Sequence, residues 1–95
     1  MKNAKEIRLY HILVTHKYEA EDLLRLLREG ESFFELAKKF STCSSAKNSG
    51  NLGEIEEKKL DEDFKEAADD LSIGETSKTP VRTRFGYHII MKLQK

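Results

Sequence analysis

The last strand of the chain constrains the fold most, because it is apolar on both faces. Residues 85–91 read Phe-Gly-Tyr-His-Ile-Ile-Met, with one histidine, His88, among the apolar side chains. A strand of this kind must be covered on both sides, so we expect it to lie at the centre of its sheet. Residues 7–15 have the same character and carry His11. The sequence therefore predicts two buried strands, each with one imidazole.

Length and composition limit the class of protein. The 95 residues predict a single domain, residues 1–95. Seventeen basic and seventeen acidic residues cancel, so neither nucleic acid nor an anionic membrane is the expected partner. No apolar run is long enough for a transmembrane helix, and the first six residues do not resemble a secretory signal. The single cysteine, Cys43, cannot form an internal disulfide, and we expect a cytoplasmic monomer unless the chain is a domain of a longer exported protein.

Three helices are predicted between the two strands. Residues 18–29 carry a helical stripe that ends at Gly30, and Ser32 with Glu35 forms a capping box for a second helix. Asp61 can cap the third helix, which residues 72–74 end. The apolar stripe of the first helix is Ala20, Leu23, Leu24 and Leu27, and that of the third is Phe64, Ala67, Ala68 and Leu71. The predicted buried face of the second helix is Phe33, Leu36, Ala37 and Phe40.

The remaining segments predict turns and edge strands. Residues 41–53 are small, polar and turn-forming, with a possible helical turn at 44–47, and residues 52–57 fit a short, charged edge strand. Residues 76–83, interrupted by Pro80, are predicted to form a second edge strand. The connection at 84–86 is too short for a crossover, so it predicts antiparallel pairing with the last strand. The order of elements is typical of an α+β layer.

The candidate reactive side chains are His11, His88 and Cys43, with hydroxyl groups at Ser44, Ser45 and Thr83. Two histidines on neighbouring strands can fix each other's tautomer. Cysteine with histidine also suggests a thiol nucleophile, and the three groups together suggest zinc, although no local spacing supports a metal site. The residue pattern alone thus predicts an α+β domain with a polar cluster in its core.

Six blocks of the sequence resemble the parvulin family of peptidyl-prolyl cis-trans isomerases and cover residues 7 to about 93 in the family's order. The blocks are residues 11–14, 40–47, 50–53, 74–77, 80–83 and 85–90. The resemblance implies a four-stranded antiparallel sheet wrapped by four helices, in the order strand, three helices, strand, helix, strand, strand. It also implies isomerisation of X–Pro bonds in proline-containing peptides and unfolded or partly folded proteins, without cofactor or metal.

The resemblance assigns residues to a catalytic centre and to a proline pocket. The positions that match the catalytic centre are His11, Cys43, Thr83 and His88. The positions that match the apolar pocket wall and its rim are Leu52, Leu60, Phe64 and Phe85. Leu60 stands where a methionine is usual, which changes the shape of the pocket, and Asn51 replaces a common Asp.

The loops bear on substrate preference. The phosphate-specific branch of the family has a basic loop after the first strand, whereas this chain offers only His16 and Lys17, so specificity for phosphorylated substrates is not expected. The acidic residues 61–63 suggest tolerance for basic residues beside the substrate proline. Ordinary charge complementarity at a helix N-terminus explains the same residues and is the favoured interpretation.

The expected mechanism is non-covalent. Rotation about the amide faces a barrier of roughly 18–20 kcal/mol, and an enzyme lowers it by binding the twisted amide better than either planar form. Cys43 and the histidines would supply a polar floor for the moving carbonyl, with the histidine pair either catalytic or structural. Two alternatives stay open: a chaperone-like peptide-binding module with little turnover, and a thiol hydrolase.

Overall fold

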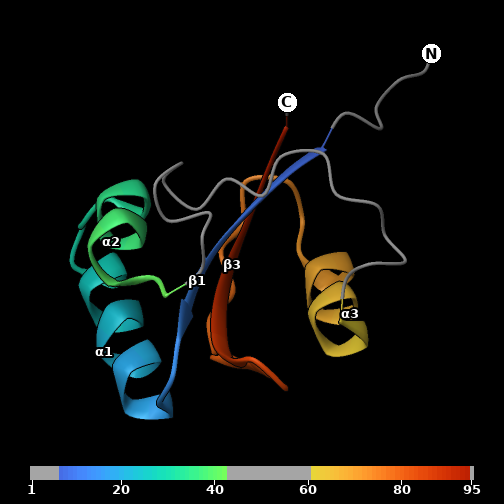
Figure 1. The fold of residues 1–95 in the computed structure, drawn as a ribbon. Helices are drawn as coiled ribbons and strands as arrows, with labels where there is room; N and C mark the ends of the chain where they lie inside the picture. The colour runs from blue at the N-terminus through green and yellow to red at the C-terminus, as the bar shows by residue number, and fades with distance from the viewer. Residues whose placement is uncertain (1–6, 43–60, 95) are drawn as a thin grey trace.

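The structure, a computed structural model, describes residues 7–42 and 61–94 (Figure 1). Its helices and strands are β1 (Ile7–Val14), α1 (Lys17–Arg28), α2 (Phe33–Phe40), α3 (Glu62–Asp70), β2 (Val81–Thr83) and β3 (Gly86–Gln94). Within these two ranges, no helix has the length and apolar character needed to cross a membrane.

The sheet places β3 at its centre. The strand order is β1-β3-β2, and both neighbours pair antiparallel with β3. The register sets His11 opposite Ile90 and Leu13 opposite His88. Side chains two residues apart on a strand share a face, so the two histidines lie diagonally on the same face of the sheet. The predicted central position of the last strand is confirmed.

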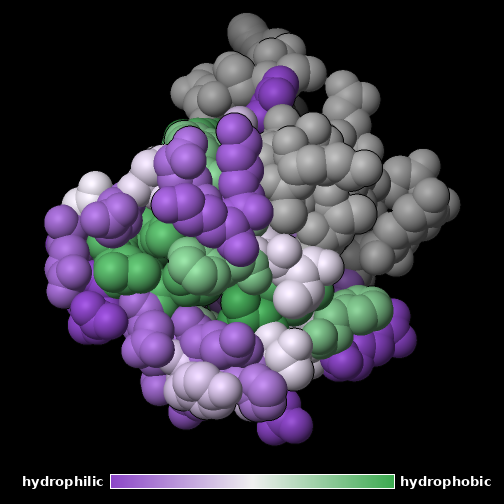
Figure 2. All heavy atoms as spheres, turned by 60° about the vertical axis from the view of Figure 1, so that its left-hand side comes forward, coloured by the Kyte–Doolittle hydropathy of each residue, from purple (hydrophilic) through white to green (hydrophobic). Residues whose placement is uncertain are grey.

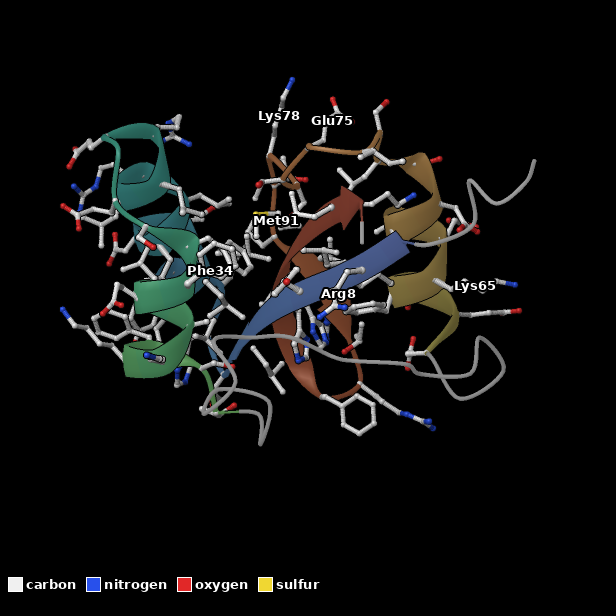
Figure 3. The ribbon with its side chains drawn as sticks, turned by 90° about the horizontal axis from the view of Figure 1, so that it is seen from above. Arg8, Phe34, Lys65, Glu75, Lys78 and Met91 are labelled. Carbon is white, nitrogen blue, oxygen red and sulfur yellow. The ribbon has the colours of Figure 1, made fainter. Side chains whose placement is uncertain are left out.

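Helices cover the sheet on both sides (Figure 1). Seen from above, α2 with Phe34 lies on one side of the strands, and α3 with Lys65 lies on the other (Figure 3). The buried residues between the sheet and α1 and α2 are Ile12, Val14, Ala20, Leu23, Leu24, Phe33, Leu36, Ala37, Ile89 and Met91. The buried residues between the sheet and α3 are Phe64, Ala68 and Ile90. The second, smaller cluster lies on the face that carries the histidines.

The ends of α1 and α2 follow from their sequences. The N–H of Gly30 donates to the carbonyl of Leu27, and the N–H of Glu31 donates to that of Leu26, which is a Schellman motif. Gly30 has φ of +101°, a conformation that glycine adopts without a steric cost. The Ser32 hydroxyl then accepts the N–H of Glu35 at 3.4 Å, as the capping prediction requires. Both predicted helix boundaries are confirmed within one residue.

The predicted burial of Phe40 is wrong. Its side chain is 49% exposed at the last position of α2, whereas the other predicted residues of that helix, Phe33, Leu36 and Ala37, are buried. Space-filling Figure 2 shows apolar side chains between polar ones on the side of the molecule that carries α1 and α2. Phe34, Phe40 and Tyr18 are exposed in these two helices.

The edge strand predicted over residues 76–83 is split in two. Val81–Thr83 pair with β3 as β2, and Thr76 forms an isolated bridge to Met91. Between them, Pro80 has no N–H to give to a ladder. The Ser77 side chain replaces a backbone group, because its hydroxyl accepts the N–H of Ile90 at 2.9 Å. The segment lies at the edge of the sheet as predicted, but it does not form one continuous strand.

The described ranges contain three strands and three helices around a small antiparallel sheet. The predicted strand at 52–57 and the helical turn at 44–47 lie outside the described residues, as do Cys43, Leu52 and Leu60. The α+β class is therefore confirmed, while the fourth strand, the fourth helix and the single-domain organisation stay predictions.

Candidate active site

Two buried histidines meet on the face of the sheet that α3 covers. The Nδ1 atoms of His11 and His88 lie 3.0 Å apart, and both side chains are 4% exposed. Their rings are nearly parallel, with centroids 5.1 Å apart and an interplanar angle of 20°. The linked pair that the sequence predicted is thus present in the structure.

Thr83 extends this pair into a chain of hydrogen bonds. Its Oγ1 lies 2.7 Å from Nε2 of His88, and the same oxygen accepts the N–H of Phe85 at 3.2 Å. Thr83 is buried at the end of β2, directly before the turn into β3. The two-residue turn Arg84–Phe85 therefore fixes the threonine against the strand that carries His88.

The geometry restricts the protonation of the two rings. A hydrogen bond between two Nδ1 atoms needs one donor and one acceptor. If both rings were protonated, the two Nδ1–H groups would point at each other and this hydrogen bond would be lost. Burial, and to a smaller extent the nearby His88, lower the pKa of His11 to about 4. Burial likewise lowers the pKa of His88 to about 4, against a smaller upward effect of Asp61. Both rings are therefore neutral at pH 7.

The imidazoles of His11 and His88 form a polar surface, here called the histidine floor, and Phe64 packs against it from the α3 side. Its ring meets His11 at 78° and His88 at 82°, with centroid separations of 5.7 and 5.1 Å. The side chain is 3% exposed and lies in the first turn of α3. An aromatic edge or face against neutral imidazoles makes an apolar wall beside polar groups. The predicted pocket residue Phe64 is thus beside the histidines, and the predicted rim residue Phe85 is 62% exposed.

The segment that leads to Cys43 is tied to the edge of β1. The Ser41 hydroxyl accepts the N–H of Leu13 at 3.0 Å, and the N–H of Thr42 donates to the carbonyl of Leu13 at 2.7 Å. Leu13 lies opposite His88, so these bonds hold residues 41 and 42 at the strand position next to the histidine pair. Cys43 itself lies outside the described residues.

A polar pocket of about 500 Å³ opens beside Thr83. It is lined by Asp63, Arg82, Thr83 and Arg84. Asp61 stands next to this pocket: its Oδ1 accepts the N–H of Asp63 at 3.1 Å, and its Oδ2 lies 3.4 Å from Nε of Arg84. The bond to Asp63 is the N-cap of α3, which supports the ordinary helix-terminus interpretation of the acidic residues.

Sequence reasoning missed Arg84 because its partner Asp61 lies 23 positions earlier in the chain. The neighbouring pair Arg84 and Phe85, whose cation–π contact is 5.1 Å from Cζ to the ring centroid, was the one local signal. Among the described residues, no group of three His, Cys, Asp or Glu side chains could hold a metal ion.

Comparison with known proteins places this geometry in a family. The model of the family described as "Rotamase: PPIC-type PPIASE domain" matches residues 11–94. The chain is 47% identical over 91 residues to foldase protein PrsA of Bacillus subtilis. The aligned region covers 95% of this chain and 31% of that protein. It therefore spans about a third of the length of this curated relative.

Solved structures agree with the sequence match. The crystal structure of PrsA from Bacillus subtilis superposes with a TM-score of 0.87 at 46% identity, over 97% of this chain and 36% of that one. The solution structure of NmPin, the parvulin of Nitrosopumilus maritimus, gives 0.79 at 42% identity, over 92% of this chain and 94% of that one. The chain thus belongs to the PPIC-type rotamase family, the parvulin peptidyl-prolyl cis-trans isomerases.

Proposed function

We propose that this domain accelerates rotation about X–Pro bonds in peptides and unfolded proteins, by binding the twisted amide non-covalently over the histidine floor. The observation that carries the proposal is the buried chain from Thr83 through His88 to His11, closed on one side by Phe64. The family match supplies the reaction class, and this chain of contacts supplies a rigid site for it.

The physical requirement of the reaction is a preorganised and dry environment. The planar amide loses its resonance as it twists, at a barrier of roughly 18–20 kcal/mol, and no bond to the substrate has to form. Polar groups that are already oriented before binding do not have to reorganise at the transition state. The hydrogen bonds of Thr83, His88 and His11 orient the imidazoles in this way, and burial keeps them neutral.

The proline ring requires an apolar wall beside these polar groups. Phe64 provides such a surface at the histidines, and Leu52 and Leu60 are proposed to extend it. The exposed Phe85, which lies two residues after Thr83 in the hairpin turn, is proposed to contact the substrate at the rim. In this arrangement the wall holds the ring while the preceding carbonyl swings over the floor.

Cys43 is proposed to face the moving carbonyl as a polar group, not as a nucleophile. The test is cis–trans exchange of Ala-Leu-Pro-Phe, measured by two-dimensional NMR exchange for the wild type and for Cys43→Asp. Acceleration by both proteins is expected, because an aspartate keeps a polar, anionic group and cannot form a thio-adduct. Acceleration by the wild type alone would favour covalent thiol chemistry. Binding without acceleration by either protein would refute the isomerase.

A chaperone-like, peptide-binding role with little turnover is the second candidate, because a site that binds the twisted and planar amides equally well does not accelerate rotation. This candidate predicts that the wild type and Cys43→Asp both bind the peptide and that neither changes its cis–trans exchange rate. Because the chain covers 31% of the Bacillus subtilis relative, the clients of a longer protein are part of this proposal and not of the family assignment. The monomeric state and the cytoplasmic location also remain proposals.

A further inference from the structure

The side chain of Arg84 is held on two sides at the mouth of the polar pocket. Its Nε lies 3.4 Å from Oδ2 of Asp61, and its Cζ lies 5.1 Å from the centroid of the Phe85 ring. The side chain is nevertheless 76% exposed. Stacking and ion pairing restrict the rotamers of a long side chain, which lowers the entropy that a ligand must remove on binding.

The anchor of Arg84 is itself fixed. The Asp61 side chain is 16% exposed, and its second oxygen accepts the N–H of Asp63 as the N-cap of α3. A guanidinium group has five N–H donors in a planar fork, and the contact with Asp61 engages the Nε side of this fork. In the part of the chain that the structure describes, Asp61 is the only ion-pair partner of Arg84. The Nη side is thus available to a ligand carboxylate.

The pocket adjoins the histidine pair through Thr83. Thr83 lines the pocket and is bonded through Oγ1 to His88, so the two sites share a residue. Arg82 and Arg84 contribute two cations to the lining, and Asp63 contributes one anion. Asp63 lies in the first turn of α3, where the positive end of the helix dipole offsets part of its charge.

We propose that Arg84 is a specificity residue of the isomerase site, and that it favours substrates with a carboxylate side chain next to the isomerising proline. The inference rests on the proposed function, because it assigns a substrate class to that same site. It is the opposite of the preference for basic neighbours that residues 61–63 suggest in the sequence. The reason is that Asp61 is already engaged by the α3 cap and by Arg84.

The experiment compares kcat/KM for peptides that differ at one neighbour of the proline. Glu, Gln or Lys is placed directly before the proline in one series of peptides and directly after it in a second series. Gln is the reference residue, because it matches Glu in shape without the charge. At low salt we expect a Glu-to-Gln ratio of about threefold in one series, the size of an exposed ion pair. At 1 M salt the Debye length is about 3 Å, so the ratio should approach one.

Two variants separate the effect of Arg84 on substrate preference from the effect of the protein's net charge. Arg84→Gln should reduce the Glu-to-Gln ratio to about one. Arg25→Gln is the matched control, because Arg25 is also an exposed arginine paired with a carboxylate, Glu29, at 3.2 Å, but it lies on α1. This control removes the same unit of charge and should keep both the ratio and the basal rate.

The outcomes distinguish the inference from the function on which it rests. Equal acceleration of the Glu and Gln peptides, or a preference for Lys, would overturn the assignment of Arg84 and leave the isomerase in place. A Glu preference that survives in Arg84→Gln would also overturn it. If no peptide in either series were accelerated, the proposed function would fail together with the inference.

Discussion

His11 and His88 lie 77 positions apart in the sequence and meet through their Nδ1 atoms at 3.0 Å on the buried face of the sheet. This contact depends on the antiparallel register of β1 and β3, which sets the two rings diagonally across the strand pair. Thr83 on the other side of β3 fixes the opposite ring nitrogen of His88. The three strands therefore contribute one side chain each to a single polar chain.

Stability should fall as the pH is lowered from about 6.5 to about 4. The folded-state pKa of each buried histidine is about 4, compared with an ordinary value of 6.5, so the unfolded state binds more protons in this window. One pKa unit corresponds to about 1.4 kcal/mol, so a shift from 6.5 to about 4 in one ring corresponds to a loss on the order of 3 kcal/mol, and the two hydrogen-bonded rings titrate as a coupled pair. Urea unfolding at several pH values measures the free energy of unfolding directly.

Removal of one buried ring tests this pH dependence. His88→Asn should weaken it, because one of the two side chains that gain a proton on unfolding is lost. An NMR titration of the folded wild type gives a second measurement that needs no variant. If both buried rings protonated near pH 6.5 in the folded protein, the prediction would be wrong.

Local sequence patterns predicted most of the elements and the pair of buried histidines, while the link of Thr83 to that pair came from the family resemblance. Gly30 and Ser32 fixed a helix end and a helix start, because capping depends on neighbours within four residues. The apolar faces around His88 predicted a central strand, because a strand covered on both sides has no polar face. The pairing of His11 with His88 followed from one imidazole on each of two buried strands.

Contacts between distant segments were not predictable in the same way. Asp61 and Arg84 join the start of α3 to the β2–β3 turn, and no periodicity relates their positions. The break in the edge strand depends on the Ser77 hydroxyl replacing a backbone acceptor for Ile90, which strand propensity does not encode. Phe40 fits the apolar stripe of α2 but lies at its last position, beyond the part of the helix that the sheet covers.

The hydroxyl of Thr83 should be required for the order of the histidine chain. Thr83→Val keeps the shape of the side chain but leaves the N–H of Phe85 and Nε2 of His88 without their partner, at an expected cost of about 1–3 kcal/mol. The ¹⁵N shifts of the His88 ring should change, since the bond that selects its tautomer is lost. Thr83→Ser keeps the oxygen and should restore the wild-type shifts. Unchanged shifts in the valine variant would contradict this role.

Gly86 should be hard to replace, because β1 and β3 approach closely there. A Cβ at this position would lie 2.5 Å from the carbonyl oxygen of Val14, and the backbone φ is +140°. Gly30→Ala is the matched control, with φ of +101° but no atom within 4 Å of the added carbon. The control should lose about 1–2 kcal/mol from backbone strain alone. Gly86→Ala should lose clearly more, as measured by urea unfolding, and equal losses would refute the close approach.

Phe85 and Phe40 provide a test of the cleft rim that does not depend on stability. Both side chains are exposed, at 62% and 49%, so replacing either with alanine should change the free energy of unfolding by less than about 1 kcal/mol. The N–H of Phe85 donates to Thr83 at the floor, whereas Phe40 ends α2, which lies on the side of the sheet opposite to α3 (Figure 3). Phe85→Ala should therefore lower kcat/KM for Ala-Leu-Pro-Phe by about fivefold or more, the effect of losing one apolar contact of roughly 1 kcal/mol, while Phe40→Ala should have no effect. If Phe85→Ala kept the wild-type kcat/KM, the proposed contact between the substrate and the β2–β3 turn would be wrong.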